Sequence, residues 1–273
     1  VRAAGDVARE KGHKIVSAQD VYEAKVSSKT LEAQMVDKAI EMKRDYEVYL
    51  NKGRAVGRVN GLAVFGDGSA GSIIPIEAAV SPPSTRNVSK VIATGKLGEI
   101  AKEAVENVSV IFKKISEKKL VKDIHIQFLQ TYEGVEGDSA SVSIATAVIS
   151  AIEDIPIRQD IAMTGSLSVR GEVLPVGGVS SKVSAAIMAG FLEVIVPKSN
   201  IQDIVLPKQD LKKIKIIPVS GLTEVLEIAL EKGTKKKKLL AQLKKIVKIE
   251  KTPLIKKVIR KTRAWLIKNN YSP

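Results

Sequence analysis

A hairpin that leads into a helix is predicted from residues 163–178, Met163-Thr-Gly-Ser-Leu-Ser-Val-Arg-Gly-Glu-Val-Leu-Pro-Val-Gly-Gly178. The helix that follows carries an inward apolar stripe of Val179, Val183, Ala186 and Ile187. Lys182 lies three residues after Val179 and shares that face. Because burial disfavours the charged form of a lysine, Lys182 is a candidate general base.

A second stretch, Gly137-Asp138-Ser139-Ala140-Ser141, opens a predicted helix of small and apolar residues that runs from Ser139 to about Ile152. So apolar a helix must be buried, and its first backbone amides are then placed to hold an oxyanion. Ser139 at this junction is a candidate nucleophile, although a serine here more commonly caps the helix. Taken together, the two stretches predict a Ser–Lys dyad.

The histidine and cysteine counts favour this chemistry over the alternatives. The only histidines are His13, in a charged N-terminal helical segment, and His125, in an alternating strand pattern, and both are expected to be surface or strand-face residues. The absence of cysteine excludes thiol nucleophiles, cysteine-ligated zinc and disulfides. Two histidines far apart in sequence form no HExxH-like pair, so we expect no metal and no cofactor in this chain.

The composition is that of a globular protein, since 44% of the 273 residues are hydrophobic and 27% are charged. No run approaches the length of a membrane span. The pattern predicts an α+β fold. The expected helices are 1–11, a Ser17-capped helix to about Lys25, 30–50, 95–118, 139–152, the Lys182 helix and 222–230; the expected strands are 58–65, 72–80, 88–93, 124–128, 193–197 and 215–218.

Two glycine motifs suggest nucleotide binding only superficially. Gly66-Asp-Gly-Ser-Ala-Gly71 matches GxGxxG, but a strand pattern follows it where a dinucleotide site requires a helix, so a hairpin turn is expected. Thr94-Gly95-Lys96-Leu97 lacks the first glycine and the final Ser or Thr of a phosphate-binding loop.

The net charge of +14 lies entirely in the C-terminal tail. Residues 232–273 hold 15 Lys and Arg against the single Glu250, and residues 1–231 hold 29 charges of each sign. Leucine and isoleucine recur at helical spacing on both sides of Pro253, which predicts two basic amphipathic helices. Such a tail binds anionic lipid, nucleic acid or an acidic protein, or else packs on its own domain with a solvated lysine face.

The run from about Val56 to Leu230 resembles the proteolytic domain of the Lon proteases, specifically of the archaeal type. The Gly-Asp-Ser-Ala-Ser box, the 164–178 run and Lys182 have the order and spacing of that family. The resemblance implies a fold like domain 2 of ribosomal protein S5, Ser139 as nucleophile, Lys182 as general base and acid, and Thr164 as the residue that holds the lysine ammonium. It also implies a ring-shaped homo-hexamer that degrades unfolded or damaged proteins.

The chain departs from the bacterial Lon pattern around the nucleophile, because it has acidic Glu136 and Asp138. Those carboxylates would pair with Lys182 and keep it charged in an idle conformation. Residues 1–27 resemble the end of the helical part of the ATPase module, where Arg2 would match a nucleotide-sensing arginine. The remaining units are then a connector helix, 28–55, the protease domain, 56–231, and the tail, 232–273.

Walker A and B are absent, and the chain begins at Val1 without a methionine, so we expect a fragment whose ATP and Mg²⁺ bind in the missing ATPase module. Archaeal members of the family carry membrane-spanning segments in that module, which implies a membrane-anchored protein with this domain on the cytoplasmic side. The competing class is a non-catalytic S5-like scaffold or nucleic-acid-binding module. Five Tyr, four Phe and one Trp offer no obvious platform for stacking bases, so catalysis is favoured.

Overall fold

The structure is a computed structural model that describes residues 2–28, 34, 49–65, 70–85, 90–94, 122–129 and 138–251. It mixes helices and strands, which confirms the α+β prediction. Its helices are α1 (Arg2–Glu10), α2 (Ala18–Ser27), α5 (Ser141–Glu153), α6 (Val179–Met188), η2 (Lys198–Asp203), α7 (Lys208–Leu211), α8 (Leu222–Ala229) and α9 (Thr234–Lys251). Its strands are β1 (Arg54–Ala55), β2 (Arg58–Phe65), β3 (Ala70–Ser81), β4 (Val91–Thr94), β5 (Asp123–Phe128), β6 (Ile157–Arg158), β7 (Ile161–Met163), β8 (Ser166–Leu167), β9 (Val173–Leu174), β10 (Glu193–Pro197) and β11 (Lys215–Val219).

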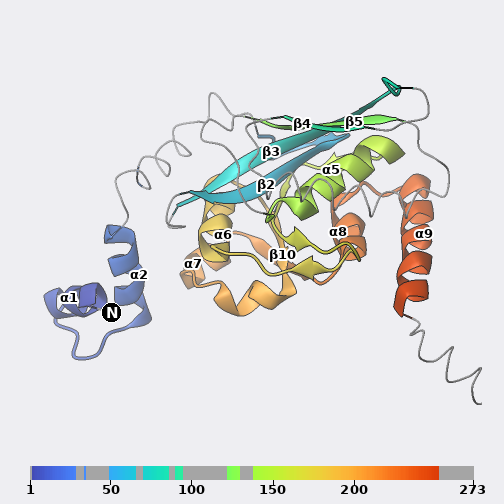
Figure 1. The fold of residues 1–273 in the computed structure, drawn as a ribbon. Helices are drawn as coiled ribbons and strands as arrows, with labels where there is room; N and C mark the ends of the chain where they lie inside the picture. The colour runs from blue at the N-terminus through green and yellow to red at the C-terminus, as the bar shows by residue number, and fades with distance from the viewer. Residues whose placement is uncertain are drawn as a thin grey trace, which may run out of the picture.

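A seven-stranded mixed sheet forms the centre of the fold, in the order β11-β10-β7-β2-β3-β5-β4. The pairs β2–β3 and β3–β5 are antiparallel, and the other neighbouring pairs are parallel. The register places Leu62 opposite Ile73 and Ile76 opposite Phe128. Figure 1 shows α5 beneath the long strands β2 and β3, with α8 and α9 beyond it.

Side-chain alternation along the strands creates two separate cores, one on each face of the sheet. Ile76 in β3 and Ile195 in β10 belong to the core that contains α5, α8 and the leucines of α9. Ile73 and Val194, which point the other way, belong to the core that contains α6. The two helices expected to carry the dyad therefore lie on opposite faces of the sheet.

Helix α5 is buried through its whole first part, residues 141–150, as its small and apolar composition predicts. It begins at Ser141, so the prediction that the helix starts at Ser139 is wrong by two residues. The cause is a turn at 138–140, in which the Ser141 amide donates to the Asp138 carbonyl at 2.9 Å.

The remaining predictions for described elements agree with the structure to within a few residues at most ends. Ser17 caps α2 with a capping box that uses Asp20, and β8 pairs with β9 to form the predicted hairpin. His13, expected to be a surface residue, bonds the fully buried Asp20 at 3.0 Å. No helix in the described ranges is long and apolar enough to cross a membrane.

Several predicted segments lie outside the described residues. These are nearly all of the 30–50 helix, the turn residues 66–69, the 95–118 helix, Glu136 and the second tail helix beyond Pro253. The first tail helix is α9, and three of its leucines, Leu239, Leu240 and Leu243, are buried in the core with α5 and α8.

Candidate active site

Ser139 is held at the end of β7 by backbone and side-chain hydrogen bonds to its carbonyl. The Gly165 amide donates to the Ser139 carbonyl at 2.9 Å, and the Thr164 hydroxyl donates to it at 3.3 Å. The carbonyl of the same Gly165 accepts a hydrogen bond from the Val142 amide at 3.1 Å. These contacts fix the turn before α5 to the segment that leaves the sheet.

The structure answers the question of whether Ser139 caps α5. The N-cap residue of α5 is Ala140, and no side chain makes the cap hydrogen bond. The hydroxyl of Ser141 is occupied by the Asp138 carbonyl. Ser139 is half-buried and precedes the cap position, so its hydroxyl is not the helix cap.

Lys182 lies in the second turn of α6, and only 2% of it is exposed. Helix α6 begins after Gly178, whose left-handed backbone (φ 64°) favours glycine, and a side chain there would collide with Val64. Burial lowers the pKa of Lys182 to about 8, and the charge of Asp138 acts in the opposite direction. The prediction that this lysine faces inward is confirmed.

Asp138 brings the two stretches into electrostatic contact. Its carboxylate is close enough to favour the ammonium form of Lys182, although the two side chains form no ion pair. The Asp138 residue is exposed, and its Oδ2 accepts a hydrogen bond from the hydroxyl of Ser166, which opens β8. The nucleophile candidate is thus held beyond the carboxyl end of β7, and the carboxylate that precedes it in the chain acts on the buried lysine.

The other predicted site residues are placed less centrally. Thr164 is fully buried, and its hydroxyl bonds the Ser139 carbonyl rather than the lysine ammonium that the resemblance assigns to it. Arg2 is exposed at the start of α1. No cluster of three or more potential metal ligands occurs within the described ranges.

Sequence reasoning missed two polar residues that support the site. Ser166 lies within the quoted hairpin stretch, but its alternating pattern did not distinguish it from Ser168. Asn200 is buried in η2 and pairs with the backbone of Val176: the Val176 amide donates to Asn200 Oδ1 at 2.8 Å, and Asn200 Nδ2 donates to the Val176 carbonyl at 3.0 Å. Asn200 thereby fastens the loop that leads into α6, and no local pattern signals this role.

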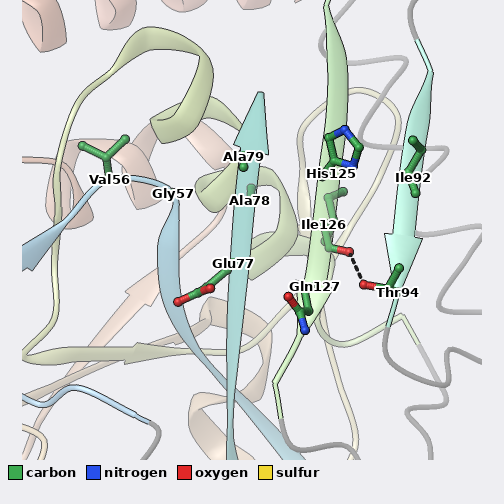
Figure 2. A pocket seen from close by; sticks show the side chains of 10 residues that line it. All are labelled: Val56, Gly57, Glu77, Ala78, Ala79, Ile92, Thr94, His125, Ile126 and Gln127. Carbon is green, nitrogen blue, oxygen red and sulfur yellow. Dashed lines mark hydrogen bonds between the residues drawn. The ribbon is translucent and has the colours of Figure 1, made fainter. Parts of the chain in front are cut away.

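A separate hollow of about 400 Å³ lies over β3, β4 and β5 and contains His125 (Figure 2). His125 Nε2 is 3.1 Å from the Ser81 hydroxyl, which forms a Ser–His pair at the end of these strands. The ring is exposed, and the nearest carboxylate in sequence, Asp123, accepts instead from the backbone amides of Ser84 and Lys90. Nothing in this arrangement orients His125 as a catalytic base, so the strand-face role predicted for it stands.

Comparison with known proteins identifies relatives of this chain. Residues 30–232 match the family of the Lon protease (S16) C-terminal proteolytic domain. The archaeal Lon protease of Thermococcus kodakarensis is 57% identical over 245 residues, which are 89% of this chain and 38% of that protein. The archaeal Lon protease of Archaeoglobus fulgidus is 56% identical over 247 residues, 90% of this chain and 40% of the relative. For Thermoplasma volcanium the identity is 53% over 270 residues, 97% of this chain and 41% of the relative. The chain therefore spans less than half the length of these relatives.

Proposed function

Because the chain belongs to the Lon protease family through its proteolytic domain, we propose that it hydrolyses peptide bonds with Ser139 as nucleophile and Lys182 as general base. The observation that carries this assignment is the burial of Lys182 within electrostatic reach of Asp138, the residue before Ser139, with a pKa lowered to about 8. A lysine near this value holds a useful neutral fraction at neutral to mildly alkaline pH, which a general base requires.

The reaction runs in two halves. Neutral Lys182 takes the proton of the Ser139 hydroxyl while Oγ attacks the peptide carbonyl carbon, and the C=O electron pair moves onto the oxygen. The lysine ammonium then gives its proton to the leaving amine as the C–N bond breaks, which leaves an acyl-enzyme. Neutral Lys182 then takes a proton from water as the water oxygen attacks the ester carbonyl carbon, and it gives that proton to Ser139 Oγ as the C–Oγ bond breaks.

The oxyanion needs backbone donors that are not already used. The amides of Ser141 and Val142 donate to the carbonyls of Asp138 and Gly165, at 2.9 and 3.1 Å. The Ala140 amide, next to Ser139 in the same turn, is therefore our candidate for the oxyanion donor.

Asp138 and Glu136 are proposed to tune this lysine. The negative charge of Asp138 raises the pKa of Lys182 against the effect of burial, and so it keeps part of the population charged and idle. Thr164 then serves the site because its hydroxyl donates to the Ser139 carbonyl and fixes it. In other conformations the same hydroxyl oxygen would accept a hydrogen bond from the Lys182 ammonium.

The role of the whole protein is inferred from the family. We propose a homo-hexameric, ATP-dependent protease of unfolded proteins, with an S5 domain 2-like fold at 56–231, a connector at 28–55 and the basic tail at 232–273. Residues 1–27, with Arg2 as nucleotide sensor, would close a preceding ATPase module that binds ATP and Mg²⁺. The intact protein would be anchored in the membrane, with this domain on the cytoplasmic side.

The basic tail is proposed to contact an anionic membrane, with DNA as the second candidate. Its first helix packs on the protein body, since Lys235 pairs with Asp154 at 2.8 Å and three leucines are buried.

The test is a truncation of the tail. Removal after Glu231 would expose core surface, so truncation after Lys251 is the cleaner test. Each cation near an anionic surface contributes about 1 kcal/mol. The truncation should lower co-sedimentation with phosphatidylglycerol vesicles at low salt and spare peptidase activity; equal binding before and after truncation would contradict the proposal.

The dyad is tested by casein hydrolysis with the 273-residue chain and single variants. Ser139→Ala and Lys182→Ala should abolish turnover, while His125→Ala, which alters the exposed Ser–His pair, should retain it. Folding of each variant is checked by circular dichroism. Near-parental activity of folded Lys182→Ala, or loss of activity only in His125→Ala, would overturn the assignment.

A further inference from the structure

A buried hydroxyl holds the carboxylate that approaches Lys182. Ser166 is 4% exposed, and its Oγ donates to Asp138 Oδ2, whereas Asp138 itself is an exposed residue. A hydrogen bond to a carboxylate is among the stronger kinds, and the donor here opens β8, shortly after β7 of the main sheet ends. The orientation of the Asp138 side chain is therefore set from the β8 side of the site.

The Ser166 hydroxyl bonds a side chain, whereas the other hydrogen bonds between the 164–165 segment and the turn at 138–140 or the start of α5 are made to backbone carbonyls. Gly165 and Thr164 donate to the Ser139 carbonyl, and the Gly165 carbonyl accepts from Val142. Those bonds fix the backbone and do not involve the Ser166 hydroxyl. Removing that hydroxyl should leave the turn in place and release only the Asp138 carboxylate.

Among the described residues, Lys182 is the charged group on which Asp138 is shown to act. Lys182 already senses Asp138 without forming an ion pair with it. The charged side chains on the elements packed against α6 are engaged elsewhere or exposed: Arg58 with Glu77 at 3.0 Å, Glu193 with Arg158 at 2.9 Å, Asp203 with Asn200 at 2.8 Å, and exposed Lys198. Within the described residues, Asp138 is thus the carboxylate available to Lys182.

We propose that Ser166 is a positioning residue whose hydroxyl holds the Asp138 carboxylate on the β8 side and so limits its approach to Lys182. The inference rests on the dyad proposed above, because only a lysine that must lose a proton is sensitive to this restraint. Ser166 in this way sets the pH at which the peptidase becomes active.

The test is the pH dependence of kcat/KM for Ser166→Ala in the 273-residue chain, with a fluorogenic peptide as substrate. The rising limb should move to higher pH by about half a unit, so that activity at pH 7.5 falls about threefold and is regained above pH 9.5. Ser166→Thr, which keeps the hydroxyl, should restore the parental midpoint. The matched control is Ser168→Ala, since Ser168 lies in the same hairpin and accepts from the Arg170 and Glu172 amides instead.

Measuring Ser166→Ala in an Asp138→Asn background separates a role of Ser166 in positioning Asp138 from a role in packing. In Asp138→Asn the charge is gone, so adding Ser166→Ala should cause no further shift of the midpoint. The proposal is overturned if Ser166→Ala lowers kcat/KM equally at every pH, if it lowers only the melting temperature, or if the shift persists in the Asp138→Asn background.

Ser139→Ala and Lys182→Ala are measured alongside. If both abolish activity while Ser166→Ala keeps the parental midpoint, the dyad stands and the role of Ser166 is wrong. If folded Lys182→Ala remains active, the dyad itself is wrong, and the role of Ser166 is overturned with it.

Discussion

The backbone of Gly71 in β3 touches the backbone of Ser181, the residue that precedes Lys182 in α6. A Cβ atom on Gly71 would lie 2.1 Å from the Ser181 carbonyl oxygen and 3.0 Å from the Ala185 side chain. A Cβ atom and a carbonyl oxygen cannot be this close, so any side chain at position 71 must push α6 away from the sheet. The position of the proposed base therefore depends on a glycine in a strand that bears no catalytic group.

We expect Gly71→Ala to lower the free energy of unfolding by about 1–3 kcal/mol, the usual cost of overpacking. Peptidase activity per folded molecule should fall as well, because Lys182 moves with α6. Urea denaturation and peptide hydrolysis measure the two effects. Gly233→Ala is the control, since a Cβ there meets nothing within 4 Å. Parental activity in a fully folded Gly71→Ala variant would show that the position of α6 is not critical.

The rate of peptide hydrolysis should rise with pH through about 8, the pKa of Lys182. The base acts in its neutral form, and the neutral fraction of a lysine grows as pH increases through its pKa. A profile of kcat/KM from pH 6 to 10, with the fold monitored by circular dichroism, measures the midpoint. A rate that falls between pH 6 and 8 while the fold persists is incompatible with a lysine base.

The free energy of unfolding should also depend on pH through the lowered pKa of Lys182. It is measured in the inactive Ser139→Ala background, where self-cleavage cannot interfere. The pKa of Lys182 is lowered from the ordinary lysine value of 10.5 to about 8 in the folded chain, so between these pH values the unfolded state binds more protons. The free energy of unfolding therefore rises with pH in this range, by about 3 kcal/mol from this one group.

Lys182→Met removes that group, so the variant should lack this increase. Urea denaturation at pH 7, 8.5 and 10 gives the comparison. The stability difference between the two chains should favour Lys182→Met most at pH 7 and shrink toward pH 10. A constant difference across this range would mean that Lys182 titrates alike in both states, and that burial does not shift it.

Sequence periodicity predicted the described elements well because their faces are unambiguous. The inward position of Lys182 followed from its spacing to Val179, and the buried α5 followed from ten positions without a charge. The start of α5 could not be predicted, because the turn at 138–140 is fixed by bonds to Gly165, which is distant in sequence.

The roles of Ser166 and Gly71 could not be predicted from local sequence patterns either. Ser166 and Ser168 alternate in the same hairpin with similar neighbours, and only tertiary structure gives Ser166 the Asp138 partner. Gly71 was expected to end a turn, yet its decisive contact is with a helix more than 100 residues further along the chain. Long-range backbone approaches of this kind leave no periodic signal.

The first tail helix is joined to the protease body by a lysine that the charge count alone would place in solvent. Lys236 is 9% exposed, and its ammonium donates to the carbonyls of Glu227 at 2.6 Å and Leu230 at 2.7 Å, at the end of α8. These carbonyls terminate a helix and have no intrahelical partner, so the lysine satisfies them from α9.

Replacing this lysine with an apolar side chain leaves those carbonyls without a donor, and Lys236→Met should lower the free energy of unfolding by about 1–3 kcal/mol. The loss should also expose Leu239 and Leu243, two residues of the same helix that are buried in the core. Lys238→Met is the control, because Lys238 is exposed on the same helix and the change removes the same charge. Urea denaturation measures stability, and protease sensitivity of the 234–251 segment reports its release. Equal effects of the two variants would mean that the charge of α9, and not the Lys236 contact, governs its attachment.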